Sequence, residues 1–275
     1  KFVPYKYFSI NMKSCYNRFM ENYFIDTHSH IDMIEDISLD EIIKSANEVN
    51  VKKIIMPAVN EQDFESKIEI CNNHENIFCM LGVFPEEAKT WDDKTYEKII
   101  NLAKNNKKVV AIGEIGLDYY WDTSFVDFQK EIFIKQIQLA NELNLPIDVH
   151  DREAHKDTFD ILKEYNKGSD IILHCFSGSV EFAKECIKEG WYLSLGGVVT
   201  FKNAKKMKEV AKEIPLEHLM LETDAPYLAP VPFRGKINEP KYIPYIAQEI
   251  ADLKETSLQN VTNVTTKNAE KVFRI

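Results

Sequence analysis

A regular alternation of short apolar runs with amphipathic segments, starting at Tyr23, constrains the fold more than any other feature of the chain. The runs are rich in strand-forming residues, and they lie at 23–25, 53–56, 77–82, 109–113, 147–150, 171–174, 192–195 and 219–222. The segments between them have apolar residues at helical spacing, and they lie at about 39–50, 62–74, 94–106, 125–144, 154–166, 179–189, 203–213 and 241–254. Eight strand–helix units in about 250 residues predict a single-domain α/β protein with a (β/α)₈ TIM barrel. An open doubly wound sheet is the alternative, but the G-x-G-x-x-G motif typical of it is missing after the first run.

No low-complexity stretch or linker divides the chain, so we expect the barrel domain to span residues 20–275, with a helical tail at 255–273. Residues 1–19 form an N-terminal extension with four basic residues and no acid. This composition suits a remnant of a targeting segment, an artificial boundary or a short natural extension. We expect a cytoplasmic or nuclear location. An organelle-targeted or secreted one stays open, because the N-terminus looks incomplete.

The bulk composition excludes several classes of protein. A net charge of −10 argues against a nonspecific nucleic-acid coat, although bound cations can make an acidic protein attract phosphate locally. No apolar run approaches the length of a membrane span. The five cysteines include no C-x-x-C pair, which argues against disulfides and against a thiolate zinc site. No dimerisation helix stands out, and we expect a monomer.

Four of the seven histidines lie at the ends of predicted strands. His28 and His30 end the first run, and residues two apart on an extended chain point to the same side. His150 ends the fifth run and His174 the sixth. A single such histidine is more often structural, but four at the end of a barrel where active sites occur predict a functional cluster.

Carboxylates join these histidines. Glu114 follows the fourth run as one acid in an apolar, glycine-punctuated stretch, where burial without a partner would be costly. Asp224 closes the eighth run, with Glu222 two residues earlier, and Asp26 precedes the histidine pair, where it could orient an imidazole. Imidazoles and carboxylates without thiolates suit Zn²⁺, Mn²⁺ or Mg²⁺. A carboxylate shared between two divalent ions would form a two-metal hydrolytic site.

Two of the four arginines lie at the predicted mouth of the barrel: Arg152, two residues after His150, and Arg234, in the loop after the eighth run. A guanidinium can bind a phosphate through two parallel hydrogen bonds. Loop-shaping salt bridges are the alternative role.

At these residues the sequence resembles the TatD family of metal-dependent deoxyribonucleases, in the branch that keeps the N-terminal His-x-His pair. The ordered set of motifs carries the resemblance: F-I-D-T-H-S-H-I-D at 24–32, G-E-I-G-L-D at 113–118, H-D-R at 150–152, H-C-F-S-G-S at 174–179, G-G-V-V-T-F-K-N-A at 196–204, L-E-T-D-A-P-Y-L-A-P at 221–230 and R-G-K-I-N-E-P at 234–240. The resemblance implies a barrel that hydrolyses DNA with two divalent metal ions. It implies His28 and His30 on one ion, His150 and His174 on the other, and Glu114 shared between them. Asp224 would bind the first ion and hold or deprotonate the attacking water.

One position departs from the family. The family often reads G-x-H-P after the third strand, whereas this chain reads G-V-F-P, with Phe84 in place of the histidine. Phe84 could stack on a nucleobase or fill the barrel rim. Phe84 thus makes a catalytically weakened DNA binder one rival to a DNase. A second rival is an amide or ester hydrolase of the amidohydrolase type on the same barrel, which His-x-His on the first strand and Asp224 on the eighth fit too.

Overall fold

Within residues 22–275, eight strands form one parallel sheet in sequence order, as the alternation predicts. The structure is a computed structural model that describes residues 22–275, so the predicted extension at 1–19 lies outside the described residues. The strands are β1 (Phe24–Asp26), β2 (Val51–Pro57), β3 (Ile77–Leu81), β4 (Val109–Asp118), β5 (Ile147–Arg152), β6 (Ile171–Leu173), β7 (Tyr192–Leu195) and β8 (Leu219–Leu221). Past the end of β1, Thr27 N donates to Leu221 O of β8 at 3.0 Å, which brings the last strand beside the first. The sheet is thus a nearly closed barrel, and the open doubly wound alternative is wrong.

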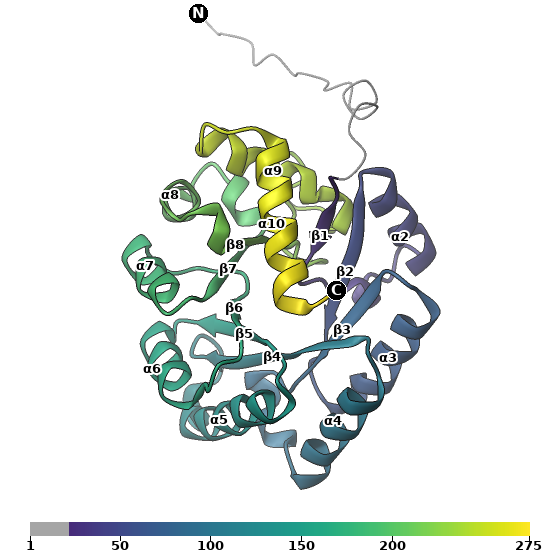
Figure 1. The fold of residues 1–275 in the computed structure, drawn as a ribbon, viewed down its shortest axis with the longest axis vertical. Coiled ribbons are helices and arrows are strands. Elements are labelled where there is room, and N and C mark those ends of the chain that lie inside the picture. The colour runs from purple at the N-terminus through teal and green to yellow at the C-terminus, as the bar shows by residue number, and fades with distance from the viewer. Residues whose placement is uncertain (1–21) are drawn as a thin grey trace, which may run out of the picture.

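Helices surround this barrel on its outer side (Figure 1). They are α2 (Leu39–Glu48), α3 (Phe64–Asn73), α4 (Asp93–Asn105), α5 (Val126–Leu143), α6 (His155–Tyr165), α7 (Val180–Lys188), α8 (Lys205–Glu213), α9 (Ile243–Leu253) and α10 (Leu258–Phe273). Several begin where a side chain accepts a hydrogen bond from the first turn; Ser38, for example, forms a reciprocal capping box with Glu41. No helix within residues 22–275 is both long and apolar enough to cross a membrane.

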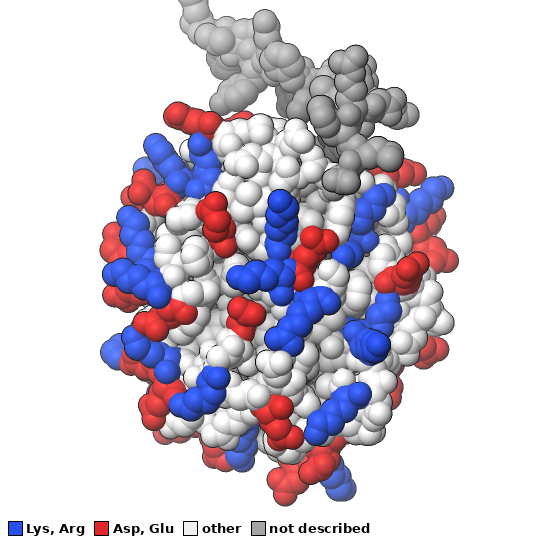
Figure 2. Space-filling model, viewed as in Figure 1, with Lys and Arg blue, Asp and Glu red and all other residues white. Residues whose placement is uncertain are grey.

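The last helix closes the amino-terminal end of the barrel. In Figure 1, α10 crosses in front of the strands. Thr266 of α10 donates to Tyr23 O just before β1, and Asn268 donates to Leu219 O at the start of β8. Val272 and Phe273 pack into an apolar layer with side chains from inside the barrel. Figure 2 shows lysine, arginine and acidic side chains interspersed over this face. Among the described residues, this face therefore has no continuous strip of positive charge along which a phosphate backbone could bind.

Several predicted strand ends differ from the structure, and three of the differences concern candidate site residues. β4 continues five residues beyond Gly113 to Asp118, so Glu114 lies inside the strand instead of following it. Gly116 makes this extension feasible, because a Cβ there would lie 1.9 Å from His150 O of the neighbouring strand. β8 ends at Leu221, so Asp224 belongs to the following loop instead of closing the strand. The histidine pair likewise follows β1, which ends at Asp26.

Candidate metal centre

The six residues predicted to bind metal lie together at the carboxyl end of the barrel. They come from five strands or the turns after them: His28 and His30 after β1, Glu114 within β4, His150 within β5, His174 after β6 and Asp224 after β8. All of them except His28, which is buried beneath, line one cavity of about 1140 Å³. The parallel strands bring their ends to one side, so residues separated by nearly 200 positions share one chamber.

Glu114 lies between two pairs of imidazoles. Its Oε1 is 2.8 Å from both His150 Nδ1 and His174 Nε2, and these two nitrogens are 3.4 Å apart. Its Oε2 is 3.4 Å from His28 Nε2 and 3.7 Å from His30 Nε2, again with the two nitrogens 3.4 Å apart. Each carboxylate oxygen therefore faces its own pair of ring nitrogens. This is the arrangement that one carboxylate shared by two cations requires.

Two further carboxylates hold these imidazoles in orientation. Asp148 Oδ2 lies 2.8 Å from His28 Nδ1, and Asp118 Oδ2 lies 2.9 Å from His150 Nε2. Each contact occupies the ring nitrogen remote from Glu114, so the other nitrogen points at the centre. Neither aspartate is among the residues that the sequence motifs predicted for the site. Alternation along the strands could have found them, because Asp148 is two residues before His150 and Asp118 four after Glu114.

Asp224 lies on the side of the centre occupied by the first histidine pair. Its Oδ1 is 3.8 Å from His30 Nε2, and its backbone N–H donates to His28 O at 3.0 Å. Its φ of +54° is rare for a residue that is not glycine. The buried carboxylate of Asp26 accepts from both the backbone N–H and the hydroxyl of Thr223, which fixes the preceding residue. Asp26 thus shapes the loop that carries Asp224, and in the described part of the chain its carboxylate forms no hydrogen bond or ion pair with an imidazole.

Glu222 is fully buried, two residues before Asp224. Its Oε1 accepts from Cys175 N at 2.7 Å and lies 4.0 Å from His174 Nδ1. It therefore fixes the turn that follows His174. Its Oε2 is buried and has no hydrogen-bond partner among residues 22–275.

The protonation of the centre follows from burial and close opposite charges. Burial alone would raise the pKa of Glu114, but the charges of His174 and His28, together with hydrogen bonds from His150 and His174, hold it well below its usual value. Burial, followed by the charge of His28, lowers the pKa of His30 to about 3. Burial also lowers the pKa of His150, but Asp118 and Glu114 outweigh it and raise that pKa to about 9. Ionised Glu114 and neutral His30 are already in the forms that bind cations.

The donor set fits hard or borderline divalent cations. Cys175 also lines the cavity, and burial raises the pKa of its thiol well above the usual value, but its sulfur belongs to neither group of donor atoms that lie close enough to share an ion. Imidazole nitrogens and carboxylate oxygens remain, in two groups whose donor atoms lie close enough to share an ion: His28, His30 and Asp224, and His28, Glu114 and His174. Zn²⁺, Mn²⁺ and Mg²⁺ all suit such donors.

The residues predicted to bind substrate occupy different places. Phe84 lines the cavity with its ring 4.7 Å from that of His150. Arg152 also lines it, with its guanidinium 3.8 Å from the ring centre of Tyr120. Arg234 rests on Phe201 at 4.3 Å and is not among the residues lining the cavity.

Comparisons with known proteins find relatives that are named metal-dependent hydrolases. The family model described as TatD related DNase matches residues 25–274. The chain is 46% identical to the metal-dependent hydrolase YabD of Bacillus subtilis, over 91% of this chain and 98% of that protein. It is 36% identical to the metal-dependent hydrolase YcfH of Escherichia coli, over 92% and 96%. The crystal structure of YjjV, a TatD homologue from Escherichia coli, superposes with a TM-score of 0.85 at 29% identity, over 92% of this chain and 98% of that one.

Proposed function

We propose that this chain, which belongs to the family of TatD related DNases and is a metal-dependent hydrolase, hydrolyses phosphodiester bonds in DNA. One observation carries the proposal: each oxygen of Glu114 faces its own pair of imidazoles, at 2.8 Å on one side and at 3.4 and 3.7 Å on the other. Two adjacent cations suit the hydrolysis of a phosphodiester, whose attacking and leaving oxygens both carry developing negative charge.

Two divalent cations would each take one histidine pair and share Glu114. His28, His30 and Asp224 would hold the first, and His150 and His174 the second. Once bound, such ions supply positive charge that lowers the pKa of water and stabilises the transition state. Asp148 and Asp118 would keep the nitrogens that coordinate these ions aimed inward.

Asp224 would serve as the proton acceptor of the reaction. It lines the cavity beside the first histidine pair, and its backbone is fixed by the hydrogen bond to His28 O. Its Oδ1 would orient the attacking water and accept a proton from it. Arg152 would position the substrate by donating to a phosphate oxygen from the cavity wall.

Glu114, which faces both histidine pairs, favours a DNase over an amide or ester hydrolase on the same barrel. Many amidohydrolases bridge their ions with a modified lysine, and in this chain Glu114 takes the strand-four place. The weakened-binder alternative depends on Phe84, which lines the same cavity.

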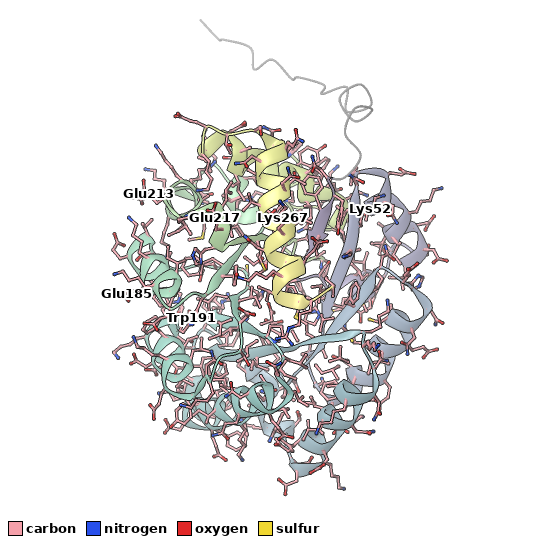
Figure 3. The ribbon with its side chains drawn as sticks, in the orientation of Figure 1. Lys52, Glu185, Trp191, Glu213, Glu217 and Lys267 are labelled. Carbon is pink, nitrogen blue, oxygen red and sulfur yellow. The ribbon has the colours of Figure 1, made fainter. Side chains whose placement is uncertain are left out.

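The test is cleavage of end-labelled single- and double-stranded DNA with Mg²⁺, Mn²⁺ or Zn²⁺. The chelator-treated enzyme and the Asp224→Asn variant are the negative arms. Glu185→Gln is the matched control, because Glu185 lies on α7 at the periphery of the barrel, outside the cavity lining (Figure 3). Products that require the cation, vanish in Asp224→Asn and persist in Glu185→Gln would support the proposal.

Intact DNA with every cation would overturn it, provided that the protein is folded. A panel of cyclic amides and aminoacyl esters would then test the amidohydrolase alternative, and turnover there would favour it. Tight DNA binding with metal but without cleavage would instead favour the weakened binder.

A further inference from the structure

Two aromatic side chains stand exposed at the rim of the cavity, directly after β4. Tyr120 is 48% exposed and Trp121 is 62% exposed, and Trp121 lines the cavity itself. Tryptophan is normally well buried, since its large apolar surface is costly to leave in water. An exposed indole beside a candidate active site therefore offers a flat apolar surface on which a ligand could stack.

A single carboxylate joins these aromatic residues to the metal centre. Asp118 Oδ1 accepts from the backbone N–H groups of Tyr120 at 2.9 Å and Trp121 at 3.3 Å, while its Oδ2 contacts His150 Nε2 at 2.9 Å. Gln129 fixes Asp118 in turn. Its side-chain oxygen accepts from the backbone N–H of Asp118, and its side-chain NH₂ group donates to the backbone carbonyl of Asp118. The backbone that carries the indole is thus held at a set position relative to the candidate ligand His150.

Arg152 completes the group. Its guanidinium lies over the Tyr120 ring at 3.8 Å and is 5.4 Å from the Trp121 ring centre. No carboxylate of residues 22–275 lies within 4.0 Å of its nitrogens, so this contact with Tyr120 holds it in place without a salt bridge. Its N–H donors remain available to a phosphate.

The rings of Tyr120 and Trp121 are nearly perpendicular, with 84° between their planes and 4.8 Å between their centroids. The guanidinium covers one face of Tyr120, so Trp121 presents the more open ring. One indole face beside one guanidinium matches one nucleotide, which has a flat base and a charged phosphate. A purely apolar partner would gain nothing from Arg152, whereas a nucleotide uses both groups.

We propose that Trp121, supported by Tyr120, stacks on an unpaired nucleobase next to the scissile phosphate while Arg152 binds a phosphate of the same strand. This inference rests on the proposed function, because it assigns a subsite to its DNA substrate. The subsite reads the presence of a base and not its identity, since every base has a stacking face.

The experiment uses tryptophan fluorescence in the full chain carrying Asp224→Asn with Mg²⁺, so that the oligonucleotide stays intact. Trp191, labelled in Figure 3 between α6 and α7, is 5% exposed and packs against Phe159, so a ligand in the cavity does not reach it. Trp91 packs against Tyr96 and is not among the residues lining the cavity. Quenching by ligand therefore reports on Trp121.

A thymidine tetranucleotide is compared with versions carrying an abasic site at each position in turn. We expect the intact strand to quench the fluorescence of Trp121. The strand with an abasic site at one particular position should cause no quenching and should bind about 5- to 100-fold more weakly than the intact strand. Trp121→Ala should weaken binding of the intact strand by a similar factor, and this variant should bind intact and abasic strands equally well. Trp121→Phe should lose the signal but keep most of the affinity, measured by anisotropy of a labelled strand.

Tyr245→Ala is the control, because Tyr245 is also exposed but does not line the cavity. Equal binding of intact and abasic strands, or unchanged affinity in Trp121→Ala, would overturn the subsite. Wild-type cleavage of DNA distinguishes the two failures: if DNA is cleaved and Trp121 has no effect, only the subsite is wrong. If wild type neither binds nor cleaves DNA, the proposed function itself fails.

Discussion

Phe84 packs edge-on against the imidazole of His150, with ring centroids 4.7 Å apart and 69° between the planes. Where the family often carries a histidine, this chain therefore places an apolar ring against a candidate metal ligand and beside the cavity. An imidazole here could donate a hydrogen bond to a phosphate, whereas the phenyl ring cannot.

Phe84→His should therefore raise the rate of DNA cleavage by about 2- to 10-fold, the value of one added hydrogen bond. Steady-state kinetics on an end-labelled oligonucleotide measure it. Phe84→Leu serves as the control, since it removes the ring without adding a donor. An unchanged or lower rate in Phe84→His would show that Phe84 does not limit the reaction.

Glu114→Gln should lose both cations together. The amide retains the shape of the side chain but not the negative charge that would be shared between the two ions. Metal content after dialysis, measured by atomic emission, should fall from two ions per chain to fewer than one, and DNA cleavage should vanish with it. Two ions retained in this variant would contradict the shared-ligand role.

Asp148→Asn should weaken metal binding by about 10- to 100-fold, as is usual when the partner of a metal-bound histidine is changed. The carboxylate oxygen of Asp148 lies 2.8 Å from His28 Nδ1. The amide of asparagine can rotate to place its NH₂ group there instead, and an NH₂ group cannot accept a hydrogen bond from the ring. Calorimetric titration with Mn²⁺ measures the change. Asp160→Asn is the control, because Asp160 lies on α6 outside the cavity lining. Equal affinities in the two variants would remove Asp148 from the centre.

Arg152→Ala should raise the KM for DNA by about 10-fold or more, the value of a hydrogen bond to a charged group. Arg234→Ala should change it less, because Arg234 rests on Phe201 and does not line the cavity. Both variants lose one positive charge, so the comparison separates position from net charge. A larger effect at Arg234 would place the phosphate outside the cavity.

Asp26 should make stability depend on pH in the metal-free protein. Burial raises its pKa to about 7, above its usual value of 3.8. Between these values the folded state holds the proton more tightly than the unfolded state, so its contribution to stability falls as pH rises. The free energy of unfolding of wild type relative to Asp26→Asn should fall between pH 4 and 7, with a slope of at most about 1.4 kcal/mol per pH unit. Urea denaturation of both proteins, after chelation, measures it. A flat or rising difference would contradict the raised pKa.

The amino-acid sequence determined the order of elements and the chemistry of the centre. The apolar runs that alternate with helical segments predicted all eight strands, and for β7 (Tyr192–Leu195) the predicted and observed bounds are the same. Periodicity reports the local face of each element, and a strand buried on both sides leaves a continuous apolar run. The histidines and acids at strand ends were visible for the same reason, because polar residues interrupt those runs.

The tertiary structure decided which of these groups meet. Asp148 and His28 are 120 residues apart, and nothing local to either sequence position pairs them. Their contact depends on the closure of the barrel and on strand register, both of which are set by packing between distant segments. The same holds for Arg152 on Tyr120, which requires β4 to extend to Asp118 beside β5. Periodicity along a chain reports which side of an element a residue occupies, but only the closed sheet brings residues on different strands within bonding distance.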